Sequence, residues 1–288
     1  MYPASFEYYR PKTLAEAAAL LGQHREARLL AGGHSLLPVL KLRLASPPAL
    51  IDIGGLAELK GIQARAGALT IGALTTHAQV VSSGEVAQHC PILAEAAAQI
   101  GDLQVRNRGT VGGSLAHADP GADYPTVMLA LGATMTASNG RATRDIAADA
   151  FFTDLFTTSL QPNELLTAVS VRSYGKGTGG AYVKHKHPAS GYAVVGVAAL
   201  VTVNGGTCEQ VSLVVGGATG TPVRATAAEQ ALRGQPVNDA TVGAAVRKVA
   251  EAIRDPLGDV YASGDYRVHL ATVLAGRALR TAAERARA

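Results

Sequence analysis

Two glycine pairs, about eighty residues apart, constrain the fold of this chain more than any other feature of its sequence. Gly32-Gly33 follows a predicted strand and precedes His34-Ser35, and Gly112-Gly113 precedes Ser114. Adjacent glycines allow positive φ angles and let the backbone approach a ligand, because no Cβ intervenes. A helix that begins directly after such a turn has backbone N–H groups free to bind an anion. Each pair is therefore either a tight turn or part of an anion-binding loop.

A carboxylate after the second pair extends the hypothesis from a single anion to a dinucleotide. Asp123 lies about ten residues after Gly113 and is placed to accept hydrogen bonds from a sugar or ribityl hydroxyl. Two glycine loops that each close on one phosphate, with an acid nearby, would hold a diphosphate without Rossmann topology. Spacing alone leaves this interpretation and the tight-turn interpretation equally open.

The predicted secondary structure divides the chain into three units. Residues 1–55 read as a small α/β unit, with a capping box at Thr13–Glu16, a short helix over 36–44 and a strand over 50–53. Residues 56–175 contain a hairpin over 61–71, an alanine-rich helix over 91–100, a helix ending near 131, a hairpin turn at Asn139-Gly140 and a strand over 164–171. Residues 176–288 contain strands over 181–186, 193–203 and 209–215, then helices over 225–232, 240–253 and from 264 to the end.

Composition excludes several classes of protein. Apolar residues make up 48% of the chain and charged residues 17%, which indicates a globular protein with a sizeable core. The net charge of +4 gives little reason to expect nucleic acid as a partner. Cys90 and Cys208 form no CxxC pair, so this chain is not expected to hold an iron–sulfur cluster or a cysteine zinc site. No apolar run is long enough to span a membrane, and no signal peptide is recognised, which favours a reducing cytoplasm.

Three further motifs carry weaker signals. Gly175–Gly180 matches G-x-G-x-x-G, but a strand follows it and no acid lies about twenty residues later, so a linker is favoured over a Rossmann loop. Gly112–Ala116 resembles a nucleophile elbow with its last glycine replaced, which argues against a serine hydrolase. His185 and His187 share one face of a predicted strand and would form half of a metal site, but a solvated strand face is favoured because no third ligand is visible.

The residues around both glycine pairs resemble a known family. The segment 31–41 looks like the first flavin motif of the FAD-binding medium subunits of molybdenum hydroxylases, and Thr110–Ser114 with Asp119, Asp123 and Pro125 looks like the second. The similarity extends over essentially the whole chain. Within the family, Gly-Gly-His-Ser in the first loop and the pattern from Tyr182-x-Lys184 to Gly191-Tyr192 are most similar to the aerobic carbon monoxide dehydrogenase branch.

The resemblance implies an α+β fold and a set of cofactor contacts. Two FAD-binding subdomains of the vanillyl-alcohol-oxidase type would precede a C-terminal domain made of a three-stranded antiparallel sheet and a helical bundle. The two loops would bind the FAD diphosphate through backbone N–H groups, the acid would bind the ribityl chain, and the tyrosine would lie near the flavin ring. No catalytic or metal-binding residue is implied. The implied FAD-binding residues are Ala31, Gly32, Gly33, His34, Ser35, Leu36, Thr110, Val111, Gly112, Gly113, Ser114, Ala118, Asp123, Leu165, Leu166, Lys184 and Tyr192.

The resemblance also implies partners and a role. A large subunit with a molybdenum cofactor would oxidise the substrate, a small subunit with two [2Fe–2S] clusters would relay electrons, and this chain's FAD would pass them to an external acceptor. The three subunits would form a heterotrimer that dimerises, in the cytoplasm or at the membrane periphery through the complex. The alternatives are a related complex that oxidises an aldehyde, a purine or an N-heterocycle, and a flavin-free assembly factor of the same fold. The chain departs from the family pattern at Ser114, where relatives often have Asn, and at Gly191, where they often have Asp.

Overall fold

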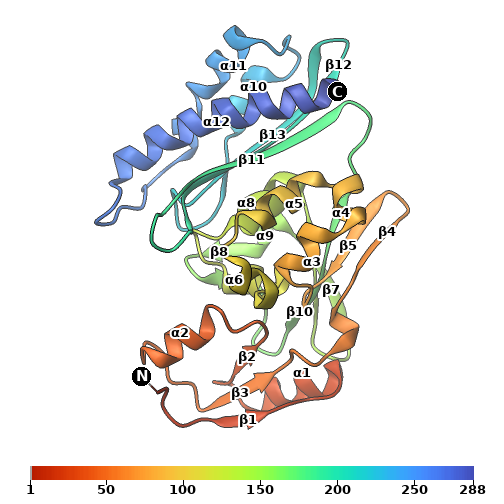
Figure 1. Ribbon diagram of the computed structural model, residues 1–288, viewed down its shortest axis with the longest axis vertical. Coiled ribbons are helices and arrows are strands. Elements are labelled where there is room, and N and C mark those ends of the chain that lie inside the picture. Colours follow the sequence, from red (N-terminus) through yellow and green to blue (C-terminus); the bar gives the residue numbers. More distant parts are fainter. Residues whose placement is uncertain (1) are drawn as a thin grey trace.

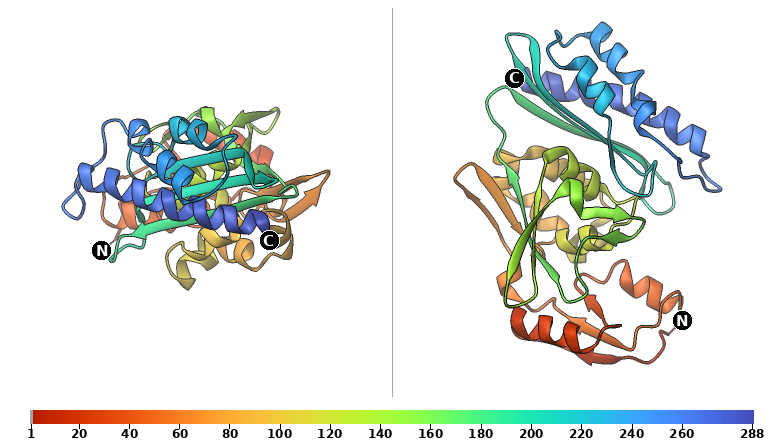
Figure 2. Two further views of the ribbon diagram at one scale, coloured as in Figure 1. Left: turned by 90° about the horizontal axis from the view of Figure 1, so that it is seen from above. Right: turned by 180° about the vertical axis from the view of Figure 1, so that it is seen from behind.

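Three units are stacked along the long axis of the molecule, with the N-terminal residues at one end and the C-terminal helix at the other (Figure 1). The structure is a computed structural model that describes residues 2–288. Each unit has its own sheet, and helices cover the sheets of the second and third units (Figure 2). The predicted α+β class with two N-terminal subdomains and a C-terminal domain is confirmed, whereas the exact boundaries at 55 and 175 stay predictions.

The first unit is a three-stranded parallel sheet in the order β1-β3-β2. Its elements are β1 (Glu7–Tyr9), α1 (Leu14–Gln23), β2 (Arg28–Leu30), α2 (Leu36–Lys41) and β3 (Ala49–Asp52). The Thr13 hydroxyl caps α1 by accepting from the Glu16 N–H, while the Glu16 carboxylate accepts from the Lys12 N–H. The α2 helix ends at Lys41, earlier than predicted, because Arg43 takes a left-handed conformation with φ of 56°.

The core of the first unit also includes residues from far along the chain. Ala17 and Ile51 pack in one buried cluster with Leu74 and Leu165, which belong to the second unit by sequence. Each of these side chains is at most 3% exposed. The first unit therefore completes its core only with side chains that the second unit supplies.

The second unit is built around an antiparallel sheet in the order β4-β5-β10-β6-β7, with β10 in the centre. Its strands are β4 (Ile62–Arg65), β5 (Ala68–Gly72), β6 (Thr134–Ser138), β7 (Thr143–Ala147), β8 (Phe152–Asp154), β9 (Thr157–Thr158) and β10 (Leu165–Arg172). Its helices are η1 (Ala57–Leu59), α3 (His77–Ser82), α4 (Gly84–His89), α5 (Pro91–Ala98), α6 (Leu103–Arg108), α7 (Val111–His117), α8 (Asp123–Leu131) and α9 (Ala148–Phe151). Both predicted hairpins, β4–β5 and β6–β7, are present.

The β6–β7 turn joins the second unit to the first. A Cβ on Gly140, which has φ of +81°, would lie 2.9 Å from the Ala18 Cβ and 3.0 Å from the Ala15 Cα of α1.

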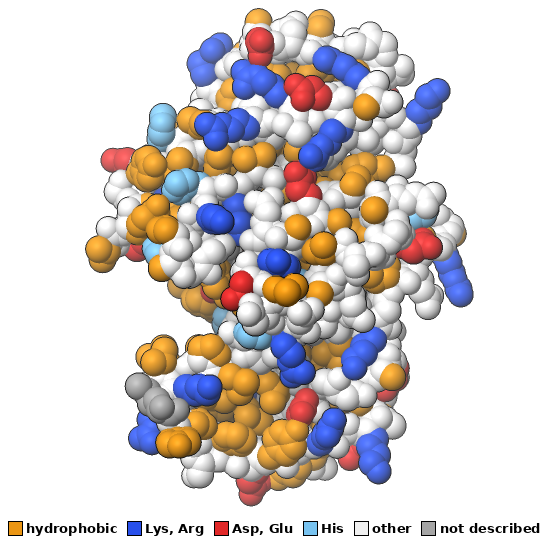
Figure 3. Space-filling model, in the orientation of Figure 1, with side chains coloured by type: hydrophobic (Ala, Val, Ile, Leu, Met, Phe, Trp, Pro, Cys, Tyr) orange, Lys and Arg blue, Asp and Glu red, His pale blue; other side chains and the backbone are white. Residues whose placement is uncertain are grey.

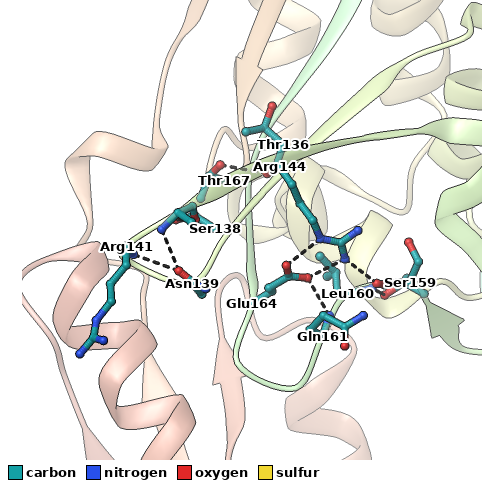
Figure 4. A network of polar contacts seen from close by, with 12 residues as sticks. Thr136, Ser138, Asn139, Arg141, Arg144, Ser159, Leu160, Gln161, Glu164 and Thr167 are labelled. Carbon is teal, nitrogen blue, oxygen red and sulfur yellow. Dashed lines mark hydrogen bonds and ion pairs between the residues drawn. The ribbon is translucent and has the colours of Figure 1, made fainter.

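Beside this turn, Arg144 forms two hydrogen bonds of 2.7 Å with the Glu164 carboxylate and donates to the Ser159 carbonyl at 2.8 Å (Figure 4). The Arg144 guanidinium lowers the pKa of Glu164. This network fixes the approach to β10 directly before Leu165.

The third unit is an antiparallel sheet with α12 lying across it (Figure 2). Its elements are β11 (Thr178–Lys186), β12 (Ala193–Asn204), β13 (Thr207–Gly216), β14 (Val223–Arg224), α10 (Thr226–Leu232), α11 (Asp239–Val246), η2 (Val249–Ala252) and α12 (Gly264–Arg287). The three long strands match the predicted three-stranded sheet, and the two-residue β14 adds a short fourth strand. The helix predicted over 240–253 is instead two, because the Lys248 N–H bonds back to Ala245 in a tightened turn after α11.

The segment Gly175–Gly180 was predicted to be a linker, but its second half belongs to strand β11. Gly179 and Gly180 belong to β11, and a Cβ on Gly179 would lie 2.1 Å from the Ala282 carbonyl oxygen of α12. This glycine therefore lets the helix rest on the sheet. Of the helices that the structure describes, none combines the length and apolar character needed to cross a membrane.

Candidate functional site

The two glycine loops lie against each other. A Cβ on Gly32 would lie 2.3 Å from the Arg108 carbonyl oxygen and 2.8 Å from the Gly109 Cα. A Cβ on Gly113 would lie 3.8 Å from the Ala31 Cβ. Contact as close as that at Gly32 is possible only because glycine lacks a Cβ. The structure therefore brings together the two segments that the sequence pairs as halves of one site.

The first loop presents a row of unpaired backbone donors. The N–H groups of residues 32–36 have no hydrogen-bond acceptor within residues 2–288. Gly33 has φ of +79°, which turns the chain, and its carbonyl accepts from the Leu37 N–H at 2.9 Å. His34 is exposed at the rim of this loop. Consecutive unpaired N–H groups in a turn form an anion-binding concavity, so this loop fits a phosphate group.

The second loop has a different construction. Its N–H groups are already paired: Val111 donates to Thr75 at 3.0 Å, Gly112 to Ala73 at 2.8 Å, Gly113 to the Thr110 hydroxyl at 3.1 Å, and Ser114 to the Thr110 carbonyl at 3.0 Å. A Cβ on Gly112 would lie 2.4 Å from the Ala73 Cβ. The glycine pair thus packs α7 onto the end of β5. What this segment offers a ligand is the Ser114 hydroxyl, which has no partner among the described residues.

Asp123 sits in a buried polar cluster between the second and third units. Its carboxylate accepts from the Tyr182 hydroxyl at 2.7 Å and from the Lys184 ammonium at 2.8 Å, and Lys184 also donates to the Gly191 carbonyl at 2.9 Å. The Asp123 residue is 4% exposed and the Lys184 side chain 1%. Burial raises the pKa of Asp123, whereas the adjacent Lys184 and Tyr182 oppose that rise. The cluster fixes the 187–192 loop against α8.

Tyr192 connects the third unit with the first loop. It is 40% exposed. Burial of part of the side chain raises the pKa of Tyr192, the nearby Ser35 side chain lowers it, and the Asp119 and Asp123 carboxylates raise it. The tyrosine therefore lies beside both the first loop and the acidic cluster, so the predicted residues Ser35, Asp123, Lys184 and Tyr192 gather in one region.

Three of the predicted FAD-binding residues are almost completely buried, namely Leu165, Leu166 and Ala118. Leu165 is 1% exposed in the core of the first unit, and Leu166 is 5% exposed in the core of the second. Ala118 ends α7 in a left-handed conformation with φ of 50° and is 5% exposed. Their proposed places near the flavin stay predictions. Leu36, by contrast, begins α2 and is only partly buried.

The sequence analysis overlooked His77 and Arg106. The His77 ring is 4% exposed and packs on Tyr124 with a centroid distance of 5.3 Å, and its backbone N–H donates to the Gly109 carbonyl at 3.0 Å. Burial, with the nearby His34 and Arg106, lowers the pKa of His77 to about 4. His77 thus supports the second loop as a neutral ring, and Arg106, which donates to the Ile100 and Gly101 carbonyls, adds positive charge near His77. The basic run just before Gly109 was the available signal for Arg106.

A crevice between the first two units ends at the glycine loops. It has a volume of about 200 Å³, and cations from both units line it, with one carboxylate. Figure 3 shows the surface notched between the lower and the middle unit. The residues that line the crevice are Arg10, Ala31, Asp52, Gly54, Lys60, Leu74, Thr76, Asn107, Arg108 and Thr110.

Comparison with known proteins gives consistent matches over the whole chain. Residues 4–172 match the model of the FAD binding domain in molybdopterin dehydrogenase, and residues 180–282 match that of the CO dehydrogenase flavoprotein C-terminal domain. The carbon monoxide dehydrogenase medium chain of Hydrogenophaga pseudoflava is 39% identical over 98% of this chain and 98% of its own length. The glyceraldehyde dehydrogenase medium chain of Sulfolobus acidocaldarius is 37% identical over 98% of this chain and all of its own length.

A solved structure agrees with the three-unit fold. Carbon monoxide dehydrogenase from Hydrogenophaga pseudoflava, in a form that lacks the Mo-pyranopterin moiety of the molybdenum cofactor, contains a chain that superimposes with a TM-score of 0.96. That chain is 41% identical, and the match covers 99% of both chains.

Proposed function

The chain belongs to the family of FAD-binding subunits of molybdopterin dehydrogenases, and from this membership we propose that it is the medium subunit of a carbon monoxide dehydrogenase. Such a subunit is part of a multi-subunit oxidoreductase. It takes electrons from [2Fe–2S] clusters of a partner subunit, passes them on through its own FAD, and leaves substrate oxidation to a partner that holds the molybdenum cofactor. The specificity for carbon monoxide rests on the similarity to the carbon monoxide dehydrogenase medium chain and its structure.

The observation that carries the cofactor assignment is the row of unpaired N–H groups at residues 32–36. A buried or partly buried amide without an acceptor costs free energy, so these groups fit a ligand that brings oxygen atoms. The FAD diphosphate supplies them. We assign Gly32, Gly33, His34, Ser35 and Leu36 to the diphosphate through their backbone, and the exposed imidazole of His34 needs no acid–base role.

The second loop would contact FAD through side chains. The Ser114 side chain is partly exposed at the start of a helix whose N–H groups at 111–114 are occupied, so we assign its hydroxyl a hydrogen bond to the cofactor. Helix α7 is held in place by Thr110, Val111, Gly112 and Gly113. Ala31 and Ala118 flank this contact.

The acidic cluster and the tyrosine would orient the rest of the cofactor. Asp123 retains capacity for a ribityl hydroxyl, because a carboxylate has about four acceptor positions and Tyr182 and Lys184 use only some of them. Tyr192 stands beside Ser35 with its ring half exposed, which suits contact with a flavin ring. FAD itself supplies the redox chemistry once bound, and these residues bind it, orient it and control its access to water.

The partners follow from the same assignment. We propose a heterotrimer with a small iron–sulfur subunit and a large molybdenum subunit, dimerised in the cell, with an external electron acceptor. Exposed apolar side chains on the first unit, among them Tyr8 at 53%, Leu42 at 57% and Leu44 at 74%, favour a subunit contact there (Figure 3). Two free, buried cysteines suit a reducing compartment, and we propose the cytoplasm.

A second candidate is the same subunit in a complex with another substrate. The 37% identity to a glyceraldehyde dehydrogenase medium chain favours an aldehyde as that substrate. This chain does not bind the substrate in either case, since the partner with the molybdenum cofactor does. A flavin-free assembly factor is disfavoured by the unpaired N–H groups of the first loop.

Purification of the protein with its co-purifying subunits tests the proposal. We expect about one FAD per chain from the visible absorbance of released flavin, and oxidation of carbon monoxide with an artificial acceptor. Flavin content near zero in an assembled complex would overturn the FAD assignment. Oxidation of glyceraldehyde but not of carbon monoxide would transfer the assignment to the second candidate.

A further inference from the structure

The third unit holds helix α8 at both of its ends. At the N-terminal end, the Asp123 carboxylate is bonded to side chains of β11. At the C-terminal end, the Arg224 guanidinium donates to the Leu129 carbonyl at 2.8 Å. The Ser212 hydroxyl donates to the Ala130 carbonyl at 2.7 Å. The third unit therefore sets the position of α8, and with it the position of the Asp123 backbone.

The backbone of Tyr182 is fixed from the opposite direction, by the second unit. Strand β11 is at the edge of its sheet, so the backbone groups on its outer side have no neighbouring strand. Helix α5 lies along that edge (Figure 1). The Glu95 carboxylate accepts from the Tyr182 N–H at 3.1 Å, and the Gln99 amide donates to the Tyr182 carbonyl at 3.3 Å. Arg285 of α12 in turn pairs with Glu95 at 2.8 Å, so these bonds hold Tyr182 in one place between the two units.

The side chain of Tyr182 is a buried hydrogen-bond donor. It is 1% exposed, and its hydroxyl donates to Asp123 Oδ1 at 2.7 Å. A Cβ on Gly196 would lie 2.3 Å from the Tyr182 hydroxyl oxygen, so the glycine at that position makes room for the phenol. Burial and the Asp123 carboxylate raise the pKa of Tyr182 well above its usual value. The hydroxyl therefore keeps its proton and acts as the donor.

The two carboxylate oxygens of Asp123 are not equivalent. Oδ1 accepts from the Tyr182 hydroxyl and from the Lys184 ammonium at 2.8 Å. Among the side chains that the structure describes, Oδ2 accepts only from Lys184, at 3.1 Å. A carboxylate oxygen has about two acceptor positions, so Oδ1 is fully used and Oδ2 retains one. Because Lys184 bridges both oxygens, the Tyr182 hydroxyl is the group that makes them different.

The 187–192 loop depends on the same cluster. Its other side borders a cavity of about 310 Å³ that two further loops complete, and His187 is among the residues that line it. Because that side is hollow, the loop relies on hydrogen bonds for its position, and Lys184 donates one of them to the Gly191 carbonyl at 2.9 Å. A change in how Asp123 holds Lys184 would therefore also shift this loop.

We propose that Tyr182 is a positioning residue for the cofactor, because its hydroxyl fixes the Asp123 carboxylate so that Oδ2 is the oxygen offered to a ribityl hydroxyl. The inference rests on the proposed function, which assigns the ribityl chain to Asp123. Tyr182 acts through Asp123 rather than by contact with the cofactor. Without the hydroxyl, Lys184 alone holds the carboxylate, and FAD must order that carboxylate on binding, which weakens the affinity.

Reconstitution of the deflavinated complex with FAD tests the proposal. Tyr182→Phe removes the donor and keeps the aromatic ring. Tyr174→Phe is the matched control, because the Tyr174 hydroxyl is also buried but has no hydrogen-bond partner among the described residues. The Kd of FAD is measured for each variant at pH 8 and at pH 6 and divided by the Kd of the parent at the same pH. This ratio cancels the titration of His34 and of every other group that the variants share.

The two pH values distinguish positioning from a general loss of packing. Burial raises the pKa of Asp123, and the contacts with Lys184 and Tyr182 oppose that rise, so removal of the Tyr182 donor raises the pKa further. Asp123 then takes up a proton at a higher pH, and a protonated carboxyl is a weaker acceptor. The other titratable groups that face Asp123 in the described chain are Lys184, Tyr124 of α8 and Tyr192. Lysine and tyrosine side chains ordinarily do not titrate between pH 6 and 8.

The expected result separates the two variants. In Tyr182→Phe, the Kd ratio is about tenfold at pH 8 and about thirtyfold at pH 6, while Tyr174→Phe stays within about twofold of the parent at both. A parent-like Kd in Tyr182→Phe, an equal loss in Tyr174→Phe, or a loss of the same size at both pH values would overturn the inference and leave the FAD assignment intact. A parent complex that does not bind FAD would instead refute the proposed function, and this inference with it.

Discussion

The two glycine pairs have nearly the same sequence and opposite uses of the backbone. In the first loop, five consecutive N–H groups at residues 32–36 have no partner within the described chain. In the second, the N–H groups of residues 111–114 all bond to protein acceptors, and Gly112 meets Ala73 at a distance that excludes any side chain. The first pair makes a binding surface, whereas the second lets a helix pack closely on a strand. Glycine content alone does not distinguish the two uses, because both depend on a missing Cβ.

Gly112→Val is expected to have the largest effect, and on folding. A Cβ at this position would lie 2.4 Å from the Ala73 Cβ and 2.8 Å from the Ala73 carbonyl oxygen. Overpacking of this kind lowers the free energy of unfolding by about 3 kcal/mol or more. Thermal unfolding of the complex measures it. Gly33→Ala is the comparison in the first loop and costs about 1 kcal/mol from its positive φ, because the added Cβ, 2.9 Å from the Leu37 Cδ1, meets only the end of an exposed side chain that can move. Equal losses of stability would contradict the proposed division of roles.

His77, which supports the second loop, should also make the free energy of unfolding depend on pH. Because burial lowers the pKa of His77 to about 4, the folded protein binds a proton there less readily than the unfolded chain, whose histidine has a pKa of 6.5. The stability that His77 contributes is complete above pH 6.5 and is lost as the pH falls toward 4, by about 3 kcal/mol. Urea unfolding at several pH values measures the slope. His77→Gln should flatten this slope, and His269→Gln, at an exposed site away from both loops, should not; an unchanged slope in His77→Gln would refute the assignment.

A charge placed in the first loop should affect binding rather than stability. His34→Glu adds a carboxylate at the rim of the unpaired N–H groups, and at an effective dielectric of about 20 its repulsion of a diphosphate is worth about 2 kcal/mol. The Kd of FAD should rise about thirtyfold, measured by reconstitution of deflavinated complex. The same charge at exposed Ala116 of α7 is the control and should have a much smaller effect. Similar losses from both charges would mean that the two loops share the diphosphate.

The smallest expected effect belongs to the hydroxyl of the second loop. Ser114→Ala removes one hydrogen bond to the cofactor and should raise the Kd of FAD by up to about tenfold, with thermal stability unchanged. Ser114→Asn restores a side-chain donor and should recover most of the affinity. A parent-like Kd in Ser114→Ala would leave the second loop with a packing role alone.

The sequence predicted the elements and the meeting of the two loops, but not how each loop works. The hairpin at Asn139-Gly140 and the cap at Thr13 are local signals, so they are readable from a few adjacent residues. The pairing of Gly112 with Ala73 and the burial of Leu165 in the first unit depend on residues far apart in the chain. Periodicity contains no information about such contacts, because it reports only which face of an element is apolar.

The residues of the candidate site also show that contacts between distant parts of the chain cannot be predicted from local sequence patterns. Resemblance located Asp123, Lys184 and Tyr192, and the structure brings them together through β11 and α8. It gave no reason to expect His77, whose role depends on burial, or the cavity beside His187, which three separate loops enclose. His185 and His187 read alike on a strand face, and only the structure separates the one that lines the cavity from the one that does not.

The shared core of the first unit determines when it can fold during synthesis. Leu165 closes that core, and it is also the first residue of β10, the central strand of the five-stranded sheet. Neither unit can be complete until the ribosome has released the chain beyond about residue 172, so the first unit cannot complete its fold ahead of the second. Until then the first unit exposes apolar surface that Leu165 will later cover, which makes the early nascent chain a natural client for chaperones.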